Sequence, residues 1–320
     1  MKWYLFGAPI FVALLMGFWA GHEWEERAHL HQEVRSTRYV EGQLTSPLLG
    51  CSDDPSELTI GERAIIEKDV TNYIARAIKA GTVRKVALYF RDLNNGPWFG
   101  IDEREQFTPG SLLKLPLALS VYYRAEREPE LFSKLVTFDG TVPPEFASLG
   151  QGDEDTLQPG VYTVKDLVTY VLRDSSNAAA ALLVSEQGDT HLEGVFTDLG
   201  IEPPKNDEYT LDVKTFGAFF RILYNASYLD QPASEELLRT MTQSTFTKGL
   251  RGGVPDTVVV AHKFGTRVLG DGTRQLHDCG IVYADQTPYI LCVMTQGQSV
   301  AALEQFIANV SRQVYEGVAR

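Results

Sequence analysis

The chain has 320 residues, of which 44% are hydrophobic and 22% charged, so it can form a folded domain with a substantial core. Its formal net charge is −13 and its pI is near 5.0. A strongly acidic protein lacks the basic surface that non-specific nucleic-acid binding requires, so we expect no nucleic-acid partner.

The first predicted element is an uncharged segment over residues 3 to 21, "WYLFGAPIFVALLMGFWAG". As a helix rising about 1.5 Å per residue, it just spans a hydrocarbon core of about 30 Å. Lys2 precedes it and Glu23 follows it, so the positive-inside rule puts the N-terminus in the cytoplasm and the rest outside. A cleaved signal peptide is the alternative, but Phe18 stands where the cleavage site at Ala20 would need a small residue.

We therefore predict a membrane anchor or signal over residues 1–22, a polar stalk over 23–58 and a catalytic domain over 59–320. This makes the protein a single-pass membrane protein with an extracytoplasmic catalytic domain, expected to be a monomer. "LLGC", ending at Cys51, resembles a lipidation box, but no apolar segment directly precedes it, so we expect no lipid there.

Within the catalytic domain, the pattern begins with apolar residues at helical spacing over 57 to 81, ending on Gly81. Residues 84 to 101 read as strand, turn and strand, with "NNG" at the turn. Residues 107 to about 250 are mostly helical, three strands follow, and an amphipathic helix over 299 to 317 closes the chain. Strands at both ends with helices between predict an α/β (α+β) fold: one antiparallel sheet beside an all-helical lobe.

The positions of the cysteines leave their pairing open. Cys279 and Cys292 fall on two strands of a predicted hairpin. Two small buried thiols are the preferred interpretation, and a cross-strand disulfide in an oxidising compartment is the alternative. No His/Cys group has zinc-ligand spacing and no Gly-rich phosphate loop occurs, so we expect no metal and no cofactor.

The stretch "FTPGSLLKLPLALSV" places Ser111 and Lys114 three residues apart at the start of an apolar helix, and so on one face. A serine hydroxyl needs a base to become a nucleophile, and a partly buried lysine can be that base. Pro109 and Gly110 fit a helix start, where the N–H of Ser111 could hold a developing oxyanion. The N–H of Thr266, on a later strand, is a candidate second donor.

Two further patterns follow in the chain. Ser175-Ser176-Asn177 lies at a break in the helical region, where a hydroxyl could relay a proton and an amide could orient a substrate amide. Lys263-Phe264-Gly265 lies on a predicted strand, where a cation would attract a carboxylate.

In this order, Ser111-x-x-Lys114, Ser175-x-Asn177 and Lys263-x-Gly265 resemble the three signatures of penicillin-recognising serine enzymes. The chain is most similar to class A β-lactamases, over roughly residues 60 to 318. The resemblance implies a β-lactamase/transpeptidase-like fold with a five-stranded sheet, and a β-lactam or a peptidoglycan peptide as substrate. The roles it implies are Ser111 as nucleophile, Lys114 as base, Ser175 as proton shuttle, Lys263 as a further catalytic group, and Asn177, Gly265 and Thr266 as substrate contacts.

The sequence departs from the class A pattern at three places. Phe264 stands where a small hydroxyl residue is usual, and Cys279 stands where a carboxylate-binding arginine is usual. The region between Asn177 and Lys263 looks truncated and lacks the glutamate that activates the deacylating water. Its nearest acids, Glu202, Asp207 and Glu208, are by default surface carboxylates. We therefore expect a β-lactam hydrolase, with a penicillin-binding D-alanyl-D-alanine peptidase or a non-turnover sensor as alternatives.

Overall fold

The computed structural model describes residues 43–46, 59–94, 96–147, 157–205, 209–284 and 287–319. The chain divides into two compact units, Met1–Ser52 and Asp53–Arg320. In the first unit the described residues are 43–46, where the Gln43 amide donates to the Thr45 hydroxyl at 3.1 Å. The predicted anchor and almost all of the predicted stalk lie outside the described residues. No helix among the described residues is both long and apolar enough to cross a membrane.

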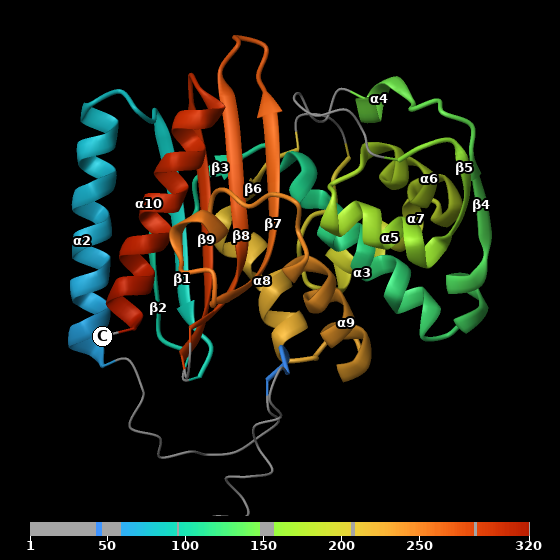
Figure 1. Ribbon diagram of the computed structural model, residues 1–320, viewed down its shortest axis with the longest axis horizontal. Helices are drawn as coiled ribbons and strands as arrows, with labels where there is room; N and C mark the ends of the chain where they lie inside the picture. Colours follow the sequence, from blue (N-terminus) through green and yellow to red (C-terminus); the bar gives the residue numbers. More distant parts are fainter. Residues whose placement is uncertain are drawn as a thin grey trace, which may run out of the picture. The chain divides into compact units, whose positions relative to one another are not determined.

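The second unit contains a five-stranded antiparallel sheet with strand order β2-β1-β9-β8-β7 (Figure 1). The strands are β1 (Lys85–Asp92), β2 (Trp98–Ile101), β7 (Val259–Val268), β8 (Arg274–Ala284) and β9 (Thr287–Gly297). Segments from both ends of the domain thus pair in one sheet, as the sequence predicted. Strand β7 is the edge strand nearest the helical lobe (Figure 1).

Helices α2 (Ile60–Lys79) and α10 (Val300–Val318) cover one face of the sheet (Figure 1). Helix α2 begins with a capping box between Thr59 and Glu62. The chain leaves the helix through Gly81 at φ +75°, the end that its sequence predicted. The apolar faces of both helices and of the sheet form one buried core, which includes Val70, Leu291 and Phe306.

Helix α8 (Val213–Tyr224) packs against the sheet at Gly217. A Cβ there would lie 2.8 Å from the Tyr89 ring, so only a glycine allows this helix to approach so closely. Beyond α8 lies the helical lobe (Figure 1). Its helices are α3 (Lys114–Ala125), α4 (Pro144–Ala147), α5 (Val164–Arg173), α6 (Asn177–Gln187), α7 (Asp189–Asp198) and α9 (Gln231–Thr242), with short 3-10 turns η1 (Gly110–Leu113) and η2 (Pro129–Ser133). A third 3-10 turn, η3 (Arg251–Gly253), packs against α10 instead.

The prediction of an all-helical lobe is wrong in one respect. Strands β4 (Leu135–Phe138) and β5 (Gly160–Thr163) pair as an antiparallel ribbon at its outer side (Figure 1). The paired residues are largely β-branched or aromatic, which favours strands, but four-residue segments are too short for their periodicity to stand out in sequence. Strands β3 (Gln106–Phe107) and β6 (Leu211–Asp212) form a second short pair.

The two cysteines of the β8–β9 hairpin are joined by a disulfide, so the expectation of two thiols is wrong. Cys279 and Cys292 stand directly opposite each other in the register, and both are fully buried. A two-residue difference in strand register would have separated them, and in a hairpin that register is fixed by the type and length of the turn.

Removing this disulfide should lower stability. A bridge that closes a loop of about 13 residues stabilises a fold by about 3 kcal/mol. We expect Cys279→Ala/Cys292→Ala to lower the denaturant midpoint accordingly, while a reducing agent lowers the midpoint of the parent only. Since the chain has three cysteines, the unfolded, unreduced parent should expose a single thiol to titration. Three titrating thiols would contradict the pairing.

Candidate active site

Ser111 and Lys114 lie where the edge of the sheet meets the helical lobe. Ser111 is in the 3-10 turn η1 and Lys114 is the first residue of α3. Residues three apart in a 3-10 turn lie on the same side, which brings both side chains to one face. They are 6% and 4% exposed. Helix α3 is buried on nearly every side, so the apolar run behind Lys114 is core, as predicted.

The backbone before Ser111 is pressed against β7. Gly110 has φ +54°, and a Cβ on it would lie 2.9 Å from the Thr266 carbonyl oxygen. A Cβ on Gly265 would lie 2.9 Å from both the Pro109 oxygen and the Leu112 nitrogen. Both glycines are therefore required for this contact. It places Ser111 beside the Gly265–Thr266 peptide, although the two segments are about 150 residues apart in sequence.

The orientation of Thr266 follows from the same contact. In an antiparallel ladder the N–H and C=O of one residue both point to the same side. Since the Thr266 carbonyl faces Gly110, its N–H points to the same open edge of β7. The N–H of Ser111 is in the first turn of a helix, where amides have no intrahelical partner. The Ser111 N–H and the Thr266 N–H thus lie on two segments in direct contact, and they are the candidate donors of an oxyanion hole.

Ser175 is held between two ammonium groups. Its hydroxyl lies 3.3 Å from Lys114 Nζ and 2.8 Å from Lys263 Nζ. Lys114 also donates to the Ser175 carbonyl and, at 2.6 Å, to Asn177 Oδ1. Lys263 also donates to the Phe264 carbonyl at 2.8 Å. Residues from three distant segments thus meet around one hydroxyl.

The loop between α5 and α6 presents Ser175 in a particular conformation. Its φ of +57° is left-handed, which costs a non-glycine residue of the order of 1 kcal/mol. The helix cap is supplied by Ser176, whose hydroxyl accepts from Ala179 N–H at 3.0 Å. The Ser175 hydroxyl is therefore left to the two lysines rather than to a structural cap.

Lys263 is fully buried. Burial, and then the neighbouring Lys114 charge, lower the pKa of Lys263 well below its ordinary value, and Asp278 opposes this. Asp278 is itself buried, accepts from Leu250 N–H at 2.8 Å and bonds the His262 ring at 2.8 Å.

His277 has a structural role. Its Nδ1 accepts from Thr295 N–H at 3.2 Å, so Nε2 carries the proton and donates to the Thr108 carbonyl at 3.1 Å. Burial lowers the pKa of His277 to about 4, so it is neutral at physiological pH. It ties β8 to the segment that leads into Ser111, a role that no sequence signal identified.

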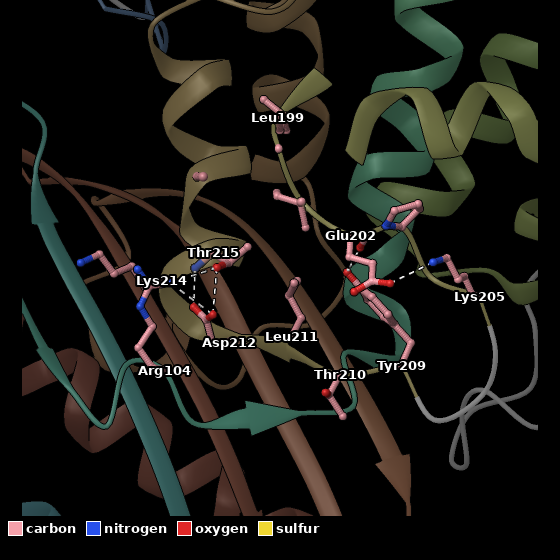
Figure 2. A pocket seen from close by; sticks show the side chains of 14 residues that line it. Arg104, Leu199, Glu202, Lys205, Tyr209, Thr210, Leu211, Asp212, Lys214 and Thr215 are labelled. Carbon is pink, nitrogen blue, oxygen red and sulfur yellow. Dashed lines mark hydrogen bonds and ion pairs between the residues drawn. The ribbon is translucent and has the colours of Figure 1, made fainter. Parts of the chain in front are cut away.

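Of the three acids that the sequence analysis named between Asn177 and Lys263, the structure describes Glu202. Glu202 forms an ion pair with Lys205 at 2.9 Å, and its side chain is 75% exposed. It lines a separate pocket of about 650 Å³ between the end of α7 and the start of α8, with Arg104 and Lys214 at another side (Figure 2). Asp207 and Glu208 lie outside the described residues. Within the described part of the chain, no carboxylate hydrogen-bonds to Ser175 or Lys263.

The structure also places the residues that depart from the class A pattern. Cys279 in β8 pairs with Lys263 in β7, and its sulfur is bonded to Cys292. Arg267 lies four residues after Lys263 in β7, which is about 13 Å along the strand. Arg274 pairs with Val268 near the hairpin turn.

Comparison with known proteins agrees with this geometry. The sequence profile described as the "Beta-lactamase enzyme family" matches residues 67–318, most of the chain. The chain belongs to the β-lactamase enzyme family. This confirms the resemblance that the three motifs indicated, and with it the expected class of enzyme, a serine hydrolase. No curated protein matches the chain.

Solved structures of known proteins share the fold of this chain. A β-lactamase from Chitinophaga pinensis DSM 2588 superposes with a TM-score of 0.68 at 20% identity, covering 78% of this chain and 98% of that one. A class A β-lactamase from Mycobacterium abscessus gives 0.64 at 20% identity, covering 78% and 98%. A mutant of PBP-A, as an acyl-enzyme complex with penicillin G, gives 0.65 at 18% identity, covering 82% and 98%. At these identities the likeness shows the fold, so the roles of individual residues rest on the geometry above.

Proposed function

We propose that this protein is a serine acyl-enzyme hydrolase that attacks the amide bond of a β-lactam through Ser111. The observation that carries the proposal is the Ser175 hydroxyl held between Lys114 and Lys263, with Lys114 one turn along the chain from Ser111. Membership of the β-lactamase family supports the same reaction.

In the proposed acylation, Lys114 in its neutral form takes the proton of the Ser111 hydroxyl as the oxygen attacks the carbonyl carbon. The N–H groups of Ser111 and Thr266 stabilise the oxyanion. When the amide bond breaks, Ser175 passes a proton to the leaving nitrogen and is reprotonated from an adjacent ammonium. Asn177 orients the substrate amide through its NH₂, because its Oδ1 is held by Lys114. The product is an ester on Ser111.

Hydrolysis of that ester needs an activated water. A specific observation therefore favours a second candidate, a penicillin-binding peptidase or sensor that acylates quickly and releases slowly. Glu202 is ion-paired and largely exposed, so it lacks the surroundings of a buried catalytic base. The likeness of the fold to PBP-A is compatible with this candidate.

One time course tests both candidates. A fragment lacking residues 1–22, mixed with a penicillin, should gain the mass of one acyl group, and Ser111→Ala should gain none. Loss of the adduct within seconds after removal of free penicillin would indicate a hydrolase, and persistence for hours would indicate the penicillin-binding candidate. A folded parent without an adduct would refute acylation at Ser111.

The location of the protein is part of the proposal. We propose a membrane-anchored protein whose catalytic domain faces the cell-wall side, where β-lactams and peptidoglycan peptides are found. The uncharged N-terminal segment supports this, and so does the Cys279–Cys292 disulfide, because disulfides persist in oxidising compartments. Fractionation of cells, followed by protease treatment of spheroplasts, would test the placement.

A further inference from the structure

Two aromatic rings border the reaction centre on the Lys263 side. The Phe246 and Phe264 rings are stacked, with centroids 4.2 Å apart and planes at 20°. Lys263 Nζ lies 4.4 Å from the centroid of the Phe264 ring. The same ammonium donates to Ser175, so the Phe264 ring lies close to the hydroxyl that is proposed to serve the leaving group.

This Phe246–Phe264 pair is assembled by the fold. Phe264 comes from β7, whereas Phe246 comes from the loop that follows α9. Both side chains are partly exposed, and both pack at the margin of the core between the sheet and its covering helices. The pair is therefore a fixed surface, and a stacked pair of rings offers a flat apolar face to a ligand.

The charges around the pair do not form a carboxylate site. Lys263 has three donors, of which two are occupied by Ser175 and by the Phe264 carbonyl. Lys248, from the same loop as Phe246, forms an ion pair with Glu304 at 2.9 Å. Asp278, opposite Phe264 in the β7–β8 register, adds a negative charge. A carboxylate placed against the two rings would lose hydration without gaining a dedicated cation.

We propose that the Phe246–Phe264 pair determines specificity for the leaving-group side of the substrate. It favours acyl donors that carry an uncharged or aromatic group there, such as an esterified β-lactam or an amidated peptide, over donors with a free carboxylate. The inference rests on the proposed function for the location of the leaving group, and extends it by naming the chemical class of substrate.

The test measures binding apart from chemistry. In a Ser111→Ala background, which cannot form the ester, calorimetric titration compares a penicillin with its methyl ester. We expect the ester to bind about tenfold more tightly than the acid. Phe264→Thr should remove or reverse that preference, because it replaces the ring by a hydroxyl that can donate to a carboxylate.

Two matched variants distinguish a loss of ligand preference from a loss of folding. Phe264→Leu keeps an apolar side chain and should keep the preference for the ester. Phe246→Ala alters the pair from the other segment and should weaken the preference while leaving β7 unchanged. Thermal unfolding confirms that each variant is folded.

The outcomes separate this inference from the proposed function. An acid that binds as tightly as the ester, or a ratio unchanged by Phe264→Thr, overturns the inference even if the parent forms an adduct. The absence of binding by either compound also overturns it. A preference for the ester that depends on Phe264, in a parent that forms no adduct, supports the inference and refutes acylation.

Discussion

Replacing Lys114 by methionine should slow acylation of Ser111 by about 10²- to 10⁴-fold, the usual contribution of a general base. Methionine keeps much of the length and apolar volume of the lysine stem but cannot accept a proton. Lys114 is one helical turn from Ser111 and donates to both Ser175 and Asn177, so its loss affects the centre of the site. The measurement is the second-order rate constant for adduct formation with a penicillin.

Two controls show what Lys114 contributes. Lys114→Arg keeps the positive charge, but a guanidinium is not deprotonated in proteins and so cannot act as the base. We expect it to be as slow as Lys114→Met, and recovery of the parent's rate would assign Lys114 an electrostatic role instead. Lys165→Met removes a half-exposed lysine that is ion-paired with Glu236, and it should leave the rate unchanged.

Replacing Lys263 by methionine should have two effects of opposite sign. Acylation should fall by about 10²- to 10³-fold, because the ammonium that holds Ser175 is lost. The free energy of unfolding at pH 7 should rise by about 1 kcal/mol, because a buried charge next to Lys114 is replaced by an apolar side chain. Ser175 keeps its contact with Lys114 in this variant.

The pH dependence of the free energy of unfolding tests whether the buried charge of Lys263 causes this difference in stability. The pKa of Lys263 is lowered in the folded protein, so above that pKa the folded protein has lost a proton that the unfolded chain still binds up to about pH 10.5. The parent should therefore gain stability as pH rises through this window, while its acylation rate falls as the ammonium deprotonates. Lys263→Met should lack this gain. A variant that is less stable than the parent at every pH would contradict the argument.

Much of the fold could be predicted from sequence because its signals are local. The capping box at Thr59 and the glycine at position 81 delimit α2, and the strand patterns identify the five strands of the sheet. The ribbon of β4 and β5 was missed, since its stability comes from pairing between segments that are more than twenty residues apart. The disulfide was judged the less favoured alternative, because register between β8 and β9 decides whether the two sulfurs meet.

The residues of the candidate site could also be predicted from the sequence, but the contacts among them could not. Motif order alone selected Ser111, Lys114, Ser175, Asn177 and Lys263, because the reaction requires these residue types and the spacing of each motif is local. The contacts among them span 61 to 88 residues of sequence, and only the packing of β7 against η1 and the α5–α6 loop brings them together. The roles of His277 and Phe246 likewise carry no local pattern.

By itself, the sequence indicated the family, the five strands of the main sheet and the candidate residues for an acyl-enzyme reaction. The tertiary structure decided which of those groups touch. It placed the Ser175 hydroxyl between two ammonium groups, packed Gly110 against Thr266 and stacked Phe246 on Phe264. The physical reason is that secondary structure and motif chemistry depend on near neighbours in the chain, whereas burial, register and electrostatics depend on segments that meet only after folding.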